Sequence, residues 1–237
     1  MAREEMRAGA AIPQAASVPD IVRAFLSAVY GWMCAGLAIT AASGWLFAGS
    51  PLLVNAIASN RMLFWGLMIA QLGIVLVLSA RVQRLAPSTA LWLFVLYSAL
   101  TGVTMSFVLL TFTGESVATT FLVTAGMFGG LASYGTVTRR NLSGLGQFLF
   151  MGLIGVVLAS IVGVFWHNDG FQFVLSFIGV IVFAGLAVYD AQRMKAMALA
   201  APHGSTGTYA ILGALTLYLD FINLFLFLLR FTGSRRD

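Results

Sequence analysis

Residues 217–231 read LYLDFINLFLFLLRF, an apolar run that contains the carboxylate of Asp220 and, near its end, Arg230. A carboxylate in such a run must be protonated, paired or hydrated, because leaving it ionised in hydrocarbon costs several kcal/mol. The run therefore predicts a membrane-spanning helix that carries a functional acid in its interior.

The composition of the whole chain also predicts that lipid surrounds most of the protein. Its 237 residues are 60% hydrophobic and 9% charged, with a mean hydropathy of +0.95. A soluble domain carries roughly a quarter of its residues as charged side chains, so we expect an all-α polytopic membrane protein with the lipid bilayer as its main partner. The net charge of +5 comes from scattered basic residues, which excludes nucleic-acid binding. Cys34 is alone, which excludes an intrachain disulfide and a cysteine metal cluster.

Seven apolar blocks are long enough to span, since a helix needs about twenty residues to cross a bilayer. Their continuous apolar character argues against a membrane β-barrel. The first twenty residues contain no apolar core and are not a signal peptide. We expect a mobile tail over 1–21, a seven-helix domain over 22–233 and a short tail over 234–237. The predicted spans are 24–47, 62–80, 90–111, 117–137, 148–166, 171–190 and 208–230.

Basic residues predict the orientation of these spans. The first, third and fifth loops contain one Arg among them, whereas the second, fourth and sixth contain six basic residues. The positive-inside rule therefore places the even loops and the N-terminus in the cytoplasm. Seven crossings would export the C-terminal tail with Arg235 and Arg236, against the same rule, so a final segment that enters and returns stays open as an alternative.

Small and aromatic residues have predicted structural roles. Gly126 and Gly130 form a small-xxx-small pair, which predicts close helix packing. Four tryptophans near the ends of predicted spans are typical of an interfacial belt: Trp45, Trp65, Trp92 and Trp166.

Only two of the eight acids lie in or at the edge of an apolar span, Asp190 and Asp220 on the last two predicted helices. Two carboxylates at hydrogen-bonding distance share one proton and titrate in two coupled steps. The pair is therefore a candidate pH sensor and gate. The partner cation would be Arg193, one turn beyond the first acid, or Arg84 or Arg81 in the second loop.

Helical spacing places further polar residues on the faces of the two acids. Thr216 and Asn223 share a face with the acid of the last span, and Gln172 and Ser176 lie on the stripe that leads to the acid of the sixth. Two polar stripes on consecutive helices face each other or a wet cavity, because neither faces lipid cheaply. These four residues are the expected supporting polar face.

The predicted depths of the two acids differ. Asp190 ends its span, whereas Asp220 lies about 18 Å deeper at 1.5 Å per residue. They meet if the last helix starts well inside the cytoplasm, or if the sixth continues through AQRMKAM while Arg193 and Lys195 snorkel to water. Otherwise the first acid forms an interfacial salt bridge and the second an interhelical hydrogen bond.

Four segments carry a resemblance to a known family. TLYLDFINLFLFLLRFTG, FAGLAVYDAQRMK, LYSALTGVTMSF and FLVTAGMFGGLASYGTVTRRNLSGLGQFLFMGLIG resemble the bacterial branch of the Bax inhibitor-1 family, the transmembrane Bax inhibitor motif proteins. The likeness runs from the first predicted span to Gly233, and the LYLDFINLFLFLLR stretch is its most specific part.

The resemblance implies a bundle in which the last helix is central and surrounded by the other six. It implies that Asp190 and Asp220 share a proton and gate a pH-dependent calcium leak, with Arg84, or Arg81 in its place, as an electrostatic latch. Gly73 stands where a similar bacterial protein has an acid, which weakens the expected cation path. Calcium takes six to eight oxygen ligands, so two aspartates would form only a weak transit site.

Two other classes compete with a leak channel. An intramembrane aspartyl protease also pairs two aspartates, and Tyr189-Asp190 matches its first motif, but LYL precedes the second aspartate where that class has G-x-G. A non-conducting membrane partner of proteases or stress machinery is the alternative function. The sequence favours a pH-gated calcium leak in the bacterial inner membrane, with no enzymatic activity and no cofactor.

Overall fold

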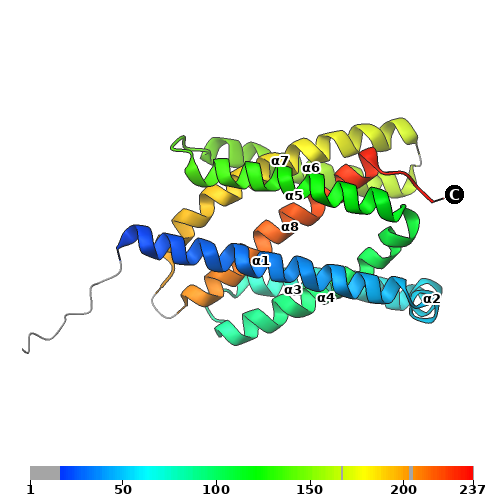
Figure 1. Ribbon diagram of the computed structural model, residues 1–237, viewed down its shortest axis with the longest axis horizontal. Coiled ribbons are helices and arrows are strands. Elements are labelled where there is room, and N and C mark those ends of the chain that lie inside the picture. Colours follow the sequence, from blue (N-terminus) through cyan, green and yellow to red (C-terminus); the bar gives the residue numbers. More distant parts are fainter. Residues whose placement is uncertain (1–16, 167, 203–204, 237) are drawn as a thin grey trace, which may run out of the picture.

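The computed structural model describes residues 17–166, 168–202 and 205–236. Within them the chain forms eight helices, seven of which are long and apolar enough to cross a membrane (Figure 1). The short exception is α2. The helices are α1 Val18–Ala48, α2 Pro51–Ser59, α3 Arg61–Ala80, α4 Pro87–Thr111, α5 Gly114–Val137, α6 Ser143–Phe165, α7 Asp169–Ala200 and α8 Thr206–Thr232.

The seven predicted spans are confirmed, with differences at their ends. The predicted tail 1–21 overlaps α1, which begins at Val18; residues 1–16 lie outside the described residues. The sixth span ends at Ala200 rather than at Asp190. The separator that follows the first span contains α2, which the sequence analysis took as a loop. α8 is one uninterrupted helix, the geometry of a full crossing rather than of a segment that enters and returns.

Local sequence sets several of these ends. Asn60 caps α3, because its Oδ1 accepts hydrogen bonds from the backbone N–H groups of Met62 and Leu63 at 3.1 Å. Asn168 caps α7 in the same way through Phe171 N–H at 2.9 Å. Pro51 and Pro87 open α2 and α4, where the missing N–H of proline has no helical partner to lose.

α8 is the central helix, as the resemblance implied. In its most apolar window 67% of the residues are buried, against 44% in α7 and 11% in α3. It runs obliquely between a layer of α5, α6 and α7 and a layer of α1, α3 and α4 (Figure 1). Its main contacts are with α1, α4, α5 and α7, while α3 packs mainly on α4 and α6 mainly on α7. The six helices expected to surround the last one therefore form two layers, and α8 lies between these layers.

Glycines permit close approach at some helix contacts but not at the predicted one. A Cβ on Gly102 of α4 would lie 2.5 Å from the carbonyl oxygen of Thr40 on α1, so these helices touch backbone to backbone. In contrast, a Cβ on Gly126 or Gly130 would meet nothing within 4 Å. The predicted packing role of this pair is wrong for the single chain, because that face of α5 points away from the described helices.

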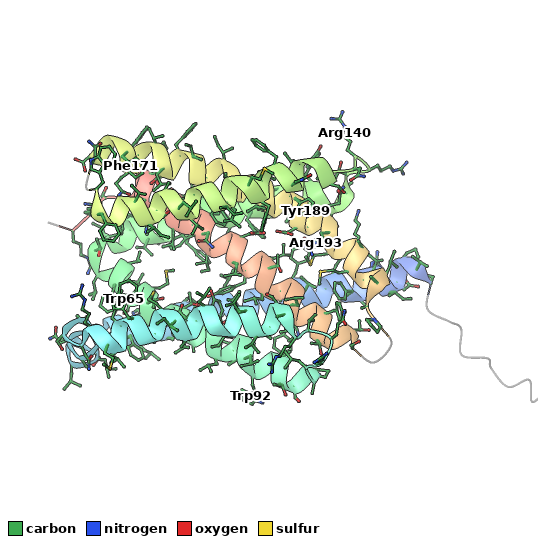
Figure 2. The ribbon with its side chains drawn as sticks, turned by 180° about the vertical axis from the view of Figure 1, so that it is seen from behind. Trp65, Trp92, Arg140, Phe171, Tyr189 and Arg193 are labelled. Carbon is green, nitrogen blue, oxygen red and sulfur yellow. The ribbon has the colours of Figure 1, made fainter. Side chains whose placement is uncertain are left out.

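The surface of the bundle agrees with immersion in lipid. All four predicted belt tryptophans are exposed, and Figure 2 shows Trp92 at the outer edge of the α3 and α4 layer. Trp65 and Trp92 lie near the starts of their helices, where an amphipathic ring meets the headgroup region.

The C-terminal tail folds back onto the corner between α4 and α5. Arg235 forms an isolated antiparallel bridge with Phe112. The backbone N–H of Thr113 donates to the Ser234 carbonyl at 3.0 Å, and Arg236 N–H donates to the Thr111 carbonyl at 2.9 Å. The tail therefore lies at the opposite end of the bundle from the start of α1 (Figure 1).

Candidate functional site

The structure brings Asp190 and Asp220 together. Asp190 on α7 and Asp220 on α8 are 7% and 5% exposed, and both line the same cavity, where the two carboxyl groups lie close enough to interact. They reach similar depth because α7 continues beyond Asp190 to Ala200 before the chain turns into α8. The continuation through AQRMKAM is one of the two alternatives that the sequence left open, and it removes the difference in depth.

One oxygen of this pair has no donor. Asp220 Oδ2 is buried without a hydrogen-bond partner among the described residues. An ionised carboxylate only accepts hydrogen bonds, so two of them in contact have nothing to exchange. A single proton held between them would supply the missing donor and remove one of two adjacent charges.

The acids open onto a cavity of about 570 Å³ between α6, α7 and α8. Its polar lining comes from all three helices. Thr216 and Asn223, two of the predicted supporting residues, belong to it; Thr216 donates to Leu212 O at 3.1 Å and Asn223 Nδ2 donates to Leu219 O at 2.8 Å. Their oxygen atoms therefore still accept hydrogen bonds or contact a cation. The other polar lining residues are Ser143, Gln147, Tyr189 and Arg193.

Sequence reasoning missed the contribution of α6. Ser143 and Gln147 are spaced by one helical turn and line the cavity from the side opposite α8. This spacing was visible in the sequence. The sequence analysis did not use it, because nothing in the sequence indicated that α6 would lie beside the acids.

Arg193 is the cation nearest the pair. Its Nη1 lies 4.0 Å from Asp190 Oδ1, and its side chain is 59% exposed, so the interaction is long and screened by solvent. Figure 2 shows Tyr189 and Arg193 on the same stretch of α7. The interfacial salt bridge considered for Asp190 is therefore present in a weak form beside the acid pair.

The predicted latch residues lie elsewhere in this structure. Arg81 and Arg84 are exposed in the connection from α3 to α4, and neither forms an ion pair within residues 17–166, 168–202 and 205–236. That connection docks on the start of α8, where Thr208 Oγ1 donates to Leu85 O at 3.2 Å. Asp220 lies about 18 Å further along α8 at 1.5 Å per residue.

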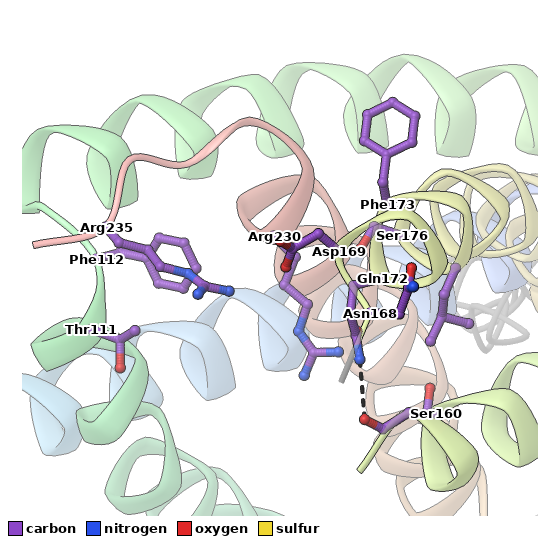
Figure 3. Close-up of a pocket in the computed structure, with 12 residues that line it drawn as sticks. Thr111, Phe112, Ser160, Asn168, Asp169, Gln172, Phe173, Ser176, Arg230 and Arg235 are labelled. Carbon is purple, nitrogen blue, oxygen red and sulfur yellow. Dashed lines mark hydrogen bonds between the residues drawn. The ribbon is translucent and has the colours of Figure 1, made fainter. Parts of the chain in front are cut away.

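Gln172 and Ser176 do not support the acid pair. They line a different pocket, at the other end of α7, and Gln172 Nε2 donates to the Gly163 carbonyl at 3.2 Å (Figure 3). Ser176 lies about 21 Å from Asp190 along the helix at 1.5 Å per residue. A shared helical stripe indicates the face of a residue but not its depth, which is why this prediction was wrong.

An aromatic stack lies between the two pockets. The rings of Phe183 on α7 and Phe227 on α8 stack with centroids 5.7 Å apart, and Phe183 also lines the acid cavity. A Cβ on Gly179 would lie 2.6 Å from the Phe227 ring, so only glycine lets this ring approach α7 so closely. The two pockets have no lining residue in common.

Few metal-binding side chains accompany the acid pair. No group of three or more His, Cys, Asp or Glu side chains gathers anywhere in the part of the chain that the structure describes. Gly73, where a similar protein has an acid, faces open space on α3, away from the acid cavity. Two carboxylates with amide and hydroxyl oxygens suit a hard cation that binds weakly and leaves.

The fold and the acid pair define a polytopic α-helical membrane protein with a buried dicarboxylate. The sequence matches the family described as "Inhibitor of apoptosis-promoting Bax1" over residues 22–237. The chain belongs to this family, the Bax inhibitor-1 family, which confirms the resemblance noted in its sequence.

The chain is 49% identical over 218 residues to the inner membrane protein YbhL of Escherichia coli K12, covering 91% of this chain and 93% of that protein. It is 44% identical over 217 residues to an uncharacterized protein of Deinococcus radiodurans, with 91% and 93% covered. An uncharacterized protein of Borreliella burgdorferi is 40% identical over 215 residues, with 90% and 93% covered. The likeness and the seven apolar helices support a multi-pass protein of the bacterial inner membrane.

Proposed function

We propose that this protein is a pH-sensitive cation leak channel that passes calcium, with Asp190 and Asp220 as its protonation switch. The observation that carries the proposal is the placement of two almost fully buried carboxyl groups in the lining of one cavity, with one of their oxygens lacking a donor. A proton shared by the pair removes one of two adjacent charges from a medium of low dielectric. In this proposal, its loss or gain changes how α7 and α8 pack.

Few other titratable side chains surround the acid pair. Tyr189 and Arg193, both on α7, are the other titratable or charged side chains that line the cavity. α6 and α8 contribute only neutral hydroxyl and amide groups besides Asp220. The charge of the cavity therefore changes mainly with the protonation of the two acids.

The stacked rings of Phe183 and Phe227 suit a closed state of such a channel. Phe183 lines the acid cavity and Phe227 stacks on it, and an apolar constriction of this kind would exclude hydrated ions. Opening would need α7 and α8 to shift enough to separate the rings.

The latch belongs to a second conformation in this proposal. Arg84, with Arg81 as the alternative, would engage the acid pair when α3 and its following loop move inward. The packing of α3 supports such movement, because α3 contacts mainly α4 and is the least buried of the spans.

We place the N-terminus and the even-numbered loops in the cytoplasm of the bacterial inner membrane. The excess of basic residues in those loops supports this orientation. The acid cavity then lies toward the cytoplasm, because Ser143 at the start of α6 lines it. The pair would sense cytoplasmic pH.

Calcium flux into liposomes that contain only the purified protein tests the proposal. Wild-type protein should leak calcium at a rate that changes severalfold with pH, and Asp190→Asn or Asp220→Asn should remove that response. Glu115→Gln is the matched control, because Glu115 is an exposed acid at the start of α5, outside the acid cavity.

Size-exclusion profiles establish that each Asn variant is folded before its flux is compared. A wild-type rate no greater than that of empty liposomes at every pH would refute conduction. That result would favour the alternative function, a non-conducting membrane partner of proteases or stress machinery.

A further inference from the structure

A second pocket lies at the end of the bundle opposite the acid cavity. It has a volume of about 710 Å³, within the range of small-ligand sites. Its walls come from the ends of α4, α6 and α8, the start of α7 and the C-terminal tail (Figure 3). The proposed leak function assigns no role to it.

Two arginines contribute the charge of this pocket. Arg230 lies in the last turn of α8 and Arg235 in the tail, and both are solvent-exposed. Figure 3 shows both guanidinium groups among the residues that line the pocket. Two positive side chains that line one pocket make it attractive to an anion.

Contacts hold the side chain of Arg230 and the backbone of Arg235 before any ligand arrives. The guanidinium carbon of Arg230 lies 5.8 Å from the centroid of the Phe227 ring, in a cation–π contact. Arg235 is held through its backbone by the bridge to Phe112, and the next residue donates to Thr111 O at 2.9 Å. On its other side, Ser234 N–H donates to Ser116 Oγ at 2.9 Å. Ordered arginines lose less entropy on binding than free ones.

The balance of charge in the pocket is positive. Asp169 is the one acid among its lining residues, against two arginines. Neither arginine forms an ion pair with Asp169 or with any other acid of residues 17–166, 168–202 and 205–236. The start of α7 adds the positive end of a helix dipole, and Ser160, Gln172 and Ser176 add neutral hydrogen-bonding groups.

The position of these arginines needs an explanation that topology does not supply. In the proposed orientation, Arg230 and Arg235 lie at the outer end of the bundle, where the positive-inside rule predicts few basic residues. An anionic ligand at this end would account for their presence, since guanidinium groups bind phosphate with paired N–H donors.

We infer that Arg230 and Arg235 form a binding site for a phosphate group. The group is the headgroup phosphate of an anionic phospholipid or a free phosphate compound, both of which present the same oxygens to the two guanidiniums. The site is independent of the proposed leak, and its ligand stabilises the end of α8 against the tail and α7.

Binding measurements on the full-length protein, in detergent for the soluble probes and in nanodiscs for the lipids, test the site. The probes are inorganic phosphate and glycerol phosphate as soluble sources, and phosphatidylglycerol against phosphatidylcholine in nanodiscs as lipid sources. The readouts are the thermal unfolding midpoint and lipid retention in native mass spectrometry. Binding of the soluble probes indicates a free phosphate compound, and selective retention of phosphatidylglycerol alone indicates a lipid.

Arg230→Gln and Arg235→Gln should each weaken binding roughly tenfold, the effect of losing one charge-assisted hydrogen bond. Arg230→Lys should weaken it less, because lysine keeps the charge and loses the paired donors. Arg61→Gln is the matched control, since Arg61 is an exposed arginine at the same end that lies outside the pocket.

Two results would overturn the site. One is wild-type protein that binds none of the four probes. The other is an Arg61→Gln variant that weakens binding as much as Arg230→Gln, which would reduce the effect to overall surface charge. If Arg230→Gln fails to fold, Arg235→Gln decides alone, because Arg235 lies in the tail outside the helices.

Discussion

The two pockets along α7 and α8 differ in the sign of their charge and in how their charge is accommodated. Asp190 and Asp220 are almost fully buried and line one cavity, whereas Arg230 and Arg235 are exposed at the end of the bundle. A buried acid has to be neutralised inside the protein, while an arginine at a helix end extends its charge to water. We therefore propose that protonation governs the first pocket and that ligand binding governs the second.

The largest effect is expected from substitutions of the two acids, which should change the acid cavity and leave the second pocket unaffected. Asp190→Asn, Asp220→Asn and the double variant should all lose the pH response of calcium flux to the same extent, because a shared proton is one functional unit. Additive losses in the two single variants, measured as flux against pH, would mean that each acid titrates by itself. Phosphate binding at the other pocket should stay unchanged in all three variants.

A smaller effect should follow from opening the stack between the pockets. Phe183→Ala removes one of the two stacked rings and should raise the basal leak severalfold at every pH, at a cost of about 3 kcal/mol in stability. Phe177→Ala is the control, since Phe177 is a lipid-facing ring on the same helix with 52% exposure. A Phe183→Ala leak no higher than that of the control would show that the stack is not the barrier.

Loosening the C-terminal tail should affect ligand binding only at the pocket that Arg230 and Arg235 line. Ser116→Ala removes the hydroxyl that accepts from Ser234 N–H, a hydrogen bond worth about 1 kcal/mol. The expected result is phosphate affinity lowered by up to about fivefold, with calcium flux unchanged. Thr119→Ala, a further small polar residue on α5, is the control. Altered flux in Ser116→Ala would indicate that the two pockets are coupled.

The smallest effect is expected at Arg193. Its ion pair with Asp190 is 4.0 Å long and exposed, so Arg193→Gln should change the free energy of unfolding by less than about 1 kcal/mol. The pH response of the flux should persist. Loss of that response, with the protein still folded by size-exclusion, would make Arg193 part of the switch and would reduce the role proposed for Arg84.

The sequence predicted the number and order of the spans because hydrocarbon allows few backbone solutions. A continuous apolar run of sufficient length satisfies its own hydrogen bonds only as a helix, so composition and length were enough. The same physics singled out Asp190 and Asp220, since an acid in such a run is costly wherever it lies. The family likeness, confirmed over residues 22–237, added the central place of α8.

Depth and contact depended on tertiary structure. Periodicity placed Gln172 and Ser176 on the stripe of Asp190, but only the folded bundle shows them in the opposite pocket. The same holds for Gly126 and Gly130, whose spacing predicts packing while their face of α5 is open.

What the sequence by itself determined is therefore the solvent of each segment and the acids that cannot remain charged in it. Whether those acids meet, which helix faces them and where the tail docks was decided by the packing of α6, α7 and α8 and by the pairing of Phe112 with Arg235. Transfer into lipid acts on each segment separately, whereas packing depends on how segments distant in the chain fit together.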